Sequence, residues 1–183
     1  GVFNTHVHGD HWLGNEAIKN AYPEAKFYGH MNMISEAELG GEGERWIELY
    51  TKYTEGLTKD TKHVVPGFGI GDGDKLTIGS EKFIIHSPFP ASHSSSDIMI
   101  EHVNSKTLFA GDNVFNNRFG RFDESSSIHN NLEILNYAKS LDIDVFVPGH
   151  GLSGDSASAL DPWLNYLNVI MDESKKGYED DLA

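Results

Sequence analysis

Short apolar runs alternate with polar segments of helical composition along the chain. Apolar runs bounded by turn-forming residues predict strands at residues 2–5, 25–28, 75–78, 81–86, 97–101, 107–110 and 145–147. Helical composition and stop signals predict helices at residues 15–21, 130–140 and 157–174. Residues 32–55 are expected to form two helices joined flexibly at positions 40–43, and residues 66–73 a turn-rich connection.

This alternation predicts an α/β architecture. The turn sequences at residues 78–81 and 104–105 join neighbouring strands closely, and they therefore indicate antiparallel pairing within that architecture. The chain has 183 residues, of which 38% are hydrophobic, and this is enough for a sizeable core. We expect a single domain over residues 1–183.

Charge and composition exclude several classes of function. The chain has 14 basic and 28 acidic residues, and its formal charge of −14 repels nucleic acid and anionic lipid surfaces. No apolar run approaches the roughly 20 residues that span a bilayer, so no membrane role is expected. The absence of cysteine excludes disulfides and thiolate ligands, but a soluble protein of this composition could be cytoplasmic or exported.

Residues 6–11 concentrate three imidazoles and a carboxylate. In an extended segment His6 and His8 share a face and could bind one ion, whereas Asp10 and His11 fall where the strand should turn and could bind a second. Imidazole nitrogen and carboxylate oxygen suit zinc, and they also suit iron or manganese. The alternative is a histidine-rich surface turn or a purification tag, but the spacing and the internal Asp argue against a tag.

A metal cluster of this kind needs further ligands from distant strand ends. Three residues meet this expectation, because each follows a predicted strand and lies beside small residues: His93, Asp112 and His150.

In this order, the segment at residues 6–11, then His93, Asp112 and His150, resembles the full ligand series of the metallo-β-lactamase-fold hydrolases. The resemblance covers positions 4–151. It implies a four-layer αββα sandwich with the metals at one edge of the two sheets. It also implies a ligand assignment: the first metal on His6, His8 and His93, the second on Asp10, His11 and His150, and Asp112 as the bridge.

Two positions indicate the branch within that family. Asp112 resembles the glyoxalase II-like and general hydrolase branches, whereas the β-lactamase branch uses Cys at this point. His8 stands where the flavodiiron oxygen reductases place Glu, which favours a hydrolase. Family members also carry several strands before the histidine-rich segment, whereas only residues 1–5 precede it here. We therefore expect an incomplete first sheet, in a fragment or in a domain completed by a second copy or another partner.

The stretch from His11 to His93, 82 positions, is long for this family. The extra material is expected to be a helical insert at about residues 31–57, acting as a lid or substrate wall through Met31, Met33, Trp46 and Tyr50. At helical spacing, simple packing of these side chains against the body is the favoured alternative.

The ligand set predicts a mechanism. Two cations roughly 3.5–4 Å apart would share a bridging hydroxide, and Asp10 would orient the attacking water or accept its proton. The expected activity is hydrolysis of a small ester, thioester, lactone, amide or phosphoester, with two divalent ions, zinc foremost and iron or manganese as alternatives. A mononuclear iron oxidoreductase of the persulfide dioxygenase type and a non-catalytic metal-binding protein remain open.

Substrate contacts are expected from two arginines that follow Asp112. Arg118 and Arg121 would suit a carboxylate or phosphate of a small-molecule substrate. Alternatively, both neutralise neighbouring acids such as Asp123 and Glu124. The remaining histidines are expected to be ordinary hydrogen-bonded polar groups, with His86 as the foremost candidate exception, one that would support the metal ligands from behind.

Overall fold

The computed structural model describes residues 1–39 and 41–181. In this part of the chain the strands form a three-stranded sheet, in the order β1-β2-β3, and a five-stranded sheet, in the order β4-β5-β6-β7-β8. The strands are β1 Val2–Phe3, β2 Phe27–His30, β3 Phe68–Ile70, β4 Lys75–Ile78, β5 Glu81–His86, β6 Met99–His102, β7 Thr107–Phe115 and β8 Val145–His150. The α-helices are α1 Asn15–Ala21, α2 Met31–Leu39, α3 Glu42–Tyr53, α4 Ile128–Ser140 and α5 Asp161–Asp181.

The two sheets differ in strand direction. Strands β1, β2 and β3 run parallel. Strands β4 to β7 pair antiparallel, and β8 joins β7 in parallel. The expected tight hairpin is present, with Ile78 opposite Glu81, so the prediction of antiparallel pairing is confirmed.

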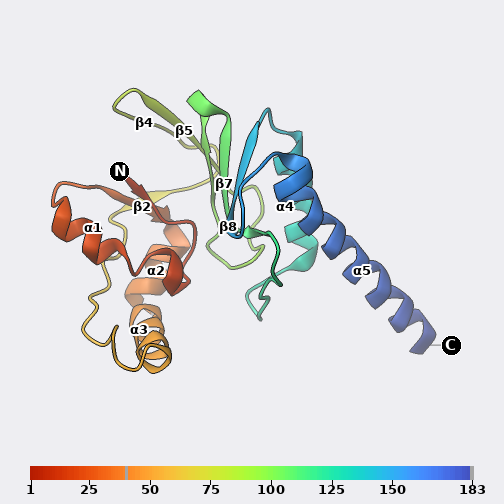
Figure 1. Cartoon of the computed structure of the whole chain (residues 1–183), viewed down its shortest axis with the longest axis horizontal. Helices are drawn as coiled ribbons and strands as arrows, with labels where there is room; N and C mark the ends of the chain where they lie inside the picture. Colours follow the sequence, from red (N-terminus) through yellow and green to blue (C-terminus); the bar gives the residue numbers. More distant parts are fainter. Residues whose placement is uncertain (40, 182–183) are drawn as a thin grey trace.

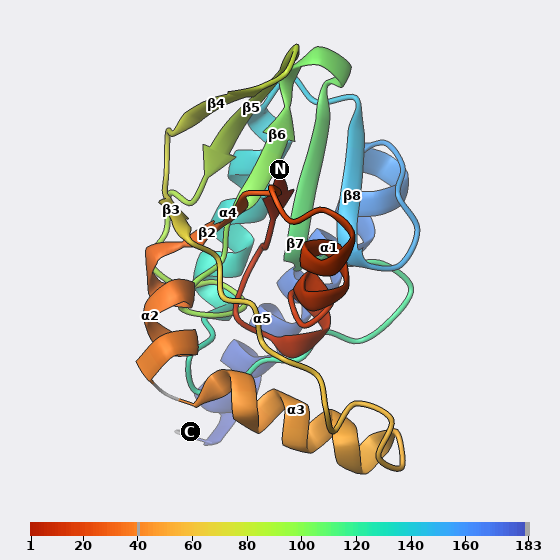
Figure 2. The same cartoon turned by 90° about the vertical axis from the view of Figure 1, so that its left-hand side faces the viewer.

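The molecule has four layers, helices on either side of two facing sheets (Figure 1, Figure 2). Along β6 successive side chains alternate between two cores. Met99 packs in the core formed with α4 and α5, while Ile100 packs in the core between the sheets, with Ile85 and Phe3. A third core, with Trp12 and Met33 at its centre, lies under the helices that cover the smaller sheet. The expected αββα sandwich is therefore confirmed.

Several local predictions need correction. The connection at residues 66–73 contains strand β3, which its glycines disguise as a turn. Gly69 pairs with Gly29, and a side chain at Gly69 would meet the exposed side chain of Met31, so the start of α2 lies close over this strand. The first strand ends at Phe3, so His6 and His8 lie in the following loop and do not belong to an extended strand.

The strands that carry Asp112 and His150 are longer than expected. Asp112 lies inside β7, and His150 is the last residue of β8. The prediction that both residues lie past the end of a strand is therefore wrong. Register shifts interrupt the β7–β8 pairing on both sides of Gly111, whose φ of 55° is left-handed. These irregularities aim Asp112 out of the regular pleat.

Some of the helices differ from their predicted limits. Helix α1 is not one of them, because it has the predicted bounds. The break between α2 and α3 is shorter than expected, because Glu42 and Gly43 are already helical, with left-handed Gly41 before them; position 40 lies outside the described residues. Helix α5 follows a π-helical turn at Ser156–Leu160 and reaches Asp181, beyond the expected end at 174, projecting from the body in Figure 1.

None of the helices in the described ranges combines the length and apolar character that crossing a bilayer requires. The single-domain assignment stays a prediction.

Candidate metal centre

The loop after β1 is fixed by side chains that bond its backbone. The amide of Asn4 donates to the carbonyl of His11 at 3.0 Å and exchanges hydrogen bonds with Asn15, the first residue of α1. Trp12 donates from its indole to the carbonyl of Val7 at 2.6 Å. All of these anchoring side chains are buried, so they fix the path of residues 6–11 from within.

The loop that carries His93 is held by a buried carboxylate. Asp97 accepts from the backbone N–H of Ser94 at 2.6 Å and from its hydroxyl at 2.7 Å, and burial raises the pKa of Asp97 to about 7. From the segment before α4, Ser126 donates to the carbonyl of His93 at 2.6 Å. The serines around His93 therefore form a structural turn and present the imidazole to the site.

Small residues let the two remaining strands approach each other at the site. A side chain at Gly149 would overlap the Oδ1 atom and the backbone N of Asp112, and one at Gly111 would press against Thr5. Glycine at these two positions is therefore required for Asp112 to face the histidine-rich loop.

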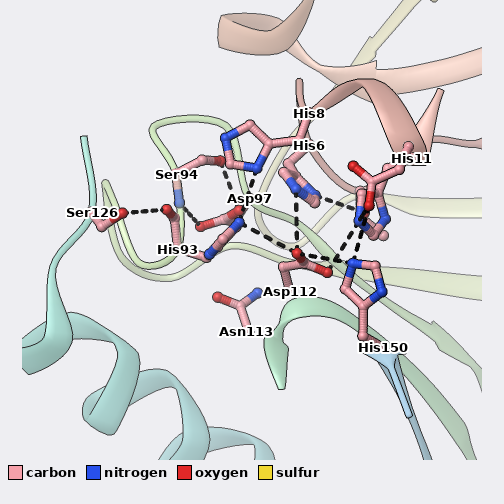
Figure 3. A network of polar contacts seen from close by, with 12 residues as sticks. His6, His8, His11, His93, Ser94, Asp97, Asp112, Asn113, Ser126 and His150 are labelled. Atoms are coloured by element: carbon pink, nitrogen blue, oxygen red, sulfur yellow. Dashed lines mark hydrogen bonds and ion pairs between the residues drawn. The ribbon is translucent and has the colours of Figure 1, made fainter. Parts of the chain in front are cut away.

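The predicted metal ligands converge in two groups (Figure 3). Donor atoms of the first group, like those of the second, lie within 4.8 Å of one another; the first group is His6, His8, His93 and Asp112, and the second is Asp10, His11 and His150. Asp112 lies between them: its Oδ1 is 3.1 Å from Nε2 of His11, and its Oδ2 is 3.4 Å from Nε2 of His93 and 3.5 Å from that of His150. All seven side chains singled out from the sequence are thus brought together.

The chemistry of this donor set fits metal ions. Within the described residues, Nε2 of His6, Nε2 of His11 and Oδ1 of Asp112 are buried without a hydrogen-bond partner, although all three point into the cluster. Buried polar atoms are normally paired, so unpaired nitrogen and carboxylate atoms converging at one place favour a cation between them. The other ring nitrogen of His6 lies 3.0 Å from the hydroxyl of Thr5, a contact that orients the imidazole with Nε2 inward.

The electrostatics agree with this fit. Burial lowers the pKa of His6 well below its ordinary value and that of His93 to about 4, so both imidazoles are neutral and able to ligate at physiological pH. Burial also tends to lower the pKa of His11, but the carboxylates of Asp10 and Asp112 outweigh it and raise that pKa to about 9. The two carboxylates therefore favour positive charge at the second group of donors.

Helix α3 forms one wall of the site. A cavity of about 160 Å³ lies over the cluster, and its lining includes Trp46 and Tyr50 from α3. The Trp46 ring lies 5.1 Å from that of His8, and burial together with the nearby Asp10 carboxylate raises the pKa of Tyr50 to about 12. The expectation of a wall therefore holds for these two residues. It is wrong for Met33, which is fully buried in the core under α2, whereas Met31 is largely exposed.

Both arginines named from the sequence line the same cavity. Over the described ranges neither Arg118 nor Arg121 forms an ion pair within 4.0 Å. The two arginines therefore do not pair directly with Asp123 or Glu124. Arg121 acts on Asp123 only at longer range.

Some supporting residues were not found from the sequence. Asn4 and Thr5 lie in a segment that the sequence predicts as an ordinary strand, and no local pattern marks them. The proposal for His86 is wrong, because its ring bonds Tyr137 at 2.7 Å and Glu101 at 2.8 Å and contacts no candidate ligand.

Comparisons with known proteins agree with this geometry. No curated protein sequence matches the chain. A metallo-beta-lactamase from Pontibacter korlensis has a similar structure, with a TM-score of 0.63 and 16% identity over 91% of this chain and 67% of that one. The metallo-beta-lactamase IND-7 is similar at a TM-score of 0.63 and 18% identity, over 91% of this chain and 67% of its own. DIM-1 metallo-beta-lactamase is similar at a TM-score of 0.63 and 17% identity, over 93% of this chain and 68% of its own.

These structural likenesses, at low identity, concern the fold. A sequence profile of the metallo-beta-lactamase superfamily matches residues 1–150, which contain all seven candidate ligands. The chain therefore belongs to the metallo-beta-lactamase superfamily.

Proposed function

We propose that the protein is a metal-dependent hydrolase that binds two divalent cations, with zinc as the first candidate and iron or manganese as alternatives. One observation carries the proposal: a buried group of donor atoms and a second, partly exposed group meet at a single carboxylate, Asp112, which reaches histidines of both groups. A site for one ion would need only the first group, and the second would then be an unexplained concentration of ligands.

The chain's own residues have distinct roles in this proposal. His6, His8 and His93 would hold one cation, Asp10, His11 and His150 would hold the other, and Asp112 would serve both. When bound, the pair of cations would lower the pKa of a shared water toward neutrality and stabilise negative charge that develops on the substrate. Asp10, about one third exposed and 3.1 Å from His150, can accept the proton of the attacking water and pass it to solvent.

The walls of the cavity favour a small substrate with an anionic group. Arg118 and Arg121 line the cavity, and neither has an ion-pair partner among residues 1–39 and 41–181; a guanidinium group is suited to a carboxylate or phosphate. The substrate would be a small ester, thioester, lactone, amide or phosphoester. The formal charge of −14 opposes binding of nucleic acid or an anionic membrane. Association with a second copy or another chain that completes the smaller sheet stays a prediction.

The test combines metal analysis with a substrate screen. Protein purified without added ions is analysed for zinc, iron and manganese, and it is assayed on chromogenic esters, thioesters, lactones and phosphoesters. We expect two equivalents of metal and hydrolysis that is lost on chelation and restored by the metal found.

The same experiment separates the alternatives. One equivalent of iron without hydrolysis would instead favour an oxidoreductase of the persulfide dioxygenase type. Bound metal without turnover in either assay would leave a non-catalytic metal-binding protein. Each of these results would contradict the proposal.

A further inference from the structure

A second cavity adjoins the candidate metal centre. It has a volume of about 320 Å³ and shares Phe115 and Arg118 with the cavity over the ligands. We call it the aromatic cleft, and its lining residues are Phe115, Asn117, Arg118, Phe119, Pro162, Trp163 and Tyr166. Strand β7 with the loop after it supplies one side, and helix α5 supplies the other.

The rings of the cleft form a continuous series that begins at a candidate ligand. Phe115 stacks on His150, with ring centroids 5.8 Å apart and planes at 9°, and its edge meets Trp163 at 5.2 Å. Trp163 stacks on Tyr166 at 5.2 Å, and Tyr166 contacts Phe119 at 5.9 Å. A flat group bound among these rings would therefore extend directly from the metal centre.

The outer members of the series are open to solvent. Phe119 is 80% exposed and Tyr166 is 38% exposed, whereas Trp163 is almost completely buried. A single exposed aromatic side chain needs no explanation, but two at the rim of a cavity that borders a candidate active site offer apolar surface to a ligand.

The loop on this side of the cleft is held against the rings. A side chain at Gly120 would come within 2.5 Å of Trp163 and 2.9 Å of Phe115, so the backbone packs directly on both rings. Asn117 has a left-handed φ of 59°. Arg118, which this turn presents, forms no ion pair within the described residues. The cleft is thus largely formed before a ligand arrives, and the guanidinium group of Arg118 lies at the end nearest the metal centre.

The cavity on another side of the site has the opposite character. It has a volume of about 470 Å³, reaches His8 and Arg121, and its lining includes four carboxylates, those of Glu36, Glu42, Asp123 and Glu124. The lining also includes Arg45 and Arg121, which leaves an excess of two carboxylates; these repel an anionic group and do not favour an apolar one. The two cavities therefore distinguish the two ends of a substrate.

We propose that the aromatic cleft binds the acyl side of the substrate, which is an ester or amide of an aryl carboxylic acid. The inference rests on the proposed hydrolase function for the position of the cleaved bond. Water forms the new bond to the acyl carbon as the bond to the alcohol or amine breaks; one proton of the water goes to the departing oxygen or nitrogen and the other to solvent. The aryl carboxylate product then lies with its ring in the cleft and its anion at Arg118. The polar leaving group occupies the carboxylate-lined cavity.

Binding of a product-like probe tests the cleft without any turnover. Isothermal titration calorimetry of the protein as purified compares 2-naphthoate with acetate. We expect 2-naphthoate to bind at least about tenfold more tightly, and Phe119→Ala and Tyr166→Ala each to weaken it about tenfold. The control variants Tyr53→Ala and Tyr178→Ala remove aromatic rings that are 72% and 67% exposed elsewhere, and they should bind like the parent protein.

A second comparison isolates Arg118. Arg118→Gln should weaken 2-naphthoate about tenfold and leave binding of the neutral 2-naphthalenemethanol unchanged. Equal affinity for naphthoate and acetate, or cleft variants that bind like the parent, would overturn the proposal. Equal loss of both naphthalene probes in Arg118→Gln would overturn the role of the arginine.

Hydrolysis assays separate failure of this inference from failure of the proposed function. If no ester is hydrolysed but naphthoate binding depends on Phe119 and Tyr166, the hydrolase proposal is wrong and the binding cleft stands. If acetyl and naphthoyl esters are hydrolysed equally well, and the cleft variants change neither rate, the hydrolase function stands. The proposal that the cleft binds the acyl side is then wrong.

Discussion

Oδ1 of Asp112 lies 3.1 Å from Nε2 of His11, yet both atoms are buried without a hydrogen bond. The carboxylate comes from the middle of β7 and the imidazole from the loop after β1, so the tertiary fold places them together. Without a metal this contact is favourable only while His11 carries a proton, which the raised pKa of about 9 allows, and neither atom then has a directed hydrogen bond. A cation that contacts both would satisfy them.

The first prediction concerns Asp112 itself. Asp112→Asn keeps the shape of the side chain but removes the charge shared by both groups of donors, so we expect metal content to fall from two equivalents to one or fewer. Hydrolysis should fall at least about 100-fold. Asp142→Asn is the control, since Asp142 is 85% exposed and within the described part of the chain pairs with Lys106 alone. Full metal content in Asp112→Asn would contradict its position between two ions.

The second prediction concerns the orientation of His6. Thr5→Val removes the hydroxyl that lies 3.0 Å from Nδ1 of His6, while the shape and the backbone bond from Ile98 remain. Loss of a contact behind a ligand should weaken metal binding about 10- to 100-fold. A competitive chelator titration measures this, with exposed Thr77→Val as the control. Equal affinities in the two variants would show that the hydroxyl does not orient the ring.

The third prediction concerns the close approach of β8 to β7. Gly149→Ala should displace Asp112, lower metal affinity and reduce the free energy of unfolding by about 1–3 kcal/mol. Nothing lies within 4 Å of the side chain that Gly67→Ala would add, so this control should keep both properties. Denaturant unfolding and metal analysis measure them, and parent-like behaviour of Gly149→Ala would remove the steric argument.

The fourth prediction is a pH dependence that belongs to Asp97. Burial raises its pKa from an ordinary 3.8 to about 7, so between these values the folded state holds a proton that the unfolded chain releases. Asp97 therefore contributes stability that is fully present below about pH 4 and is lost as pH rises toward 7.

Unfolding of the metal-depleted protein measures this dependence. In Asp97→Asn the fall in the free energy of unfolding between pH 4 and pH 7 should be smaller by up to a few kcal/mol, at about 1.4 kcal/mol per pH unit. Identical pH profiles for the parent and the variant would contradict the shifted pKa.

The candidate ligands could be predicted because each has a local signature. His93, Asp112 and His150 stand beside small residues that the close approach of backbones requires, and residues 6–11 concentrate donors too densely for an ordinary turn. Their convergence confirms the geometric expectation, although Asp112 and His150 lie within strands. Strand continuation past Gly111 depends on pairing with β8, which no local pattern encodes.

Other parts of the site could not be predicted for a different physical reason. Trp46 and Tyr50 have ordinary helical spacing, which is equally compatible with packing and with lining a cavity. The position of α3 over the site decides between these two roles. Trp163 and Tyr166 look like the apolar face of a C-terminal helix until the loop after Asp112 is placed beside them. Strand β3 has too many glycines for its sequence to resemble a strand.

The number and position of bound ions test the central claim most directly. Crystals of the protein loaded with zinc, measured on both sides of the zinc absorption edge, would locate each ion by its anomalous scattering. We predict two peaks, one among His6, His8, His93 and Asp112 and the other among Asp10, His11 and His150, with Asp112 in contact with both. A single peak, or none at these residues, would contradict the account.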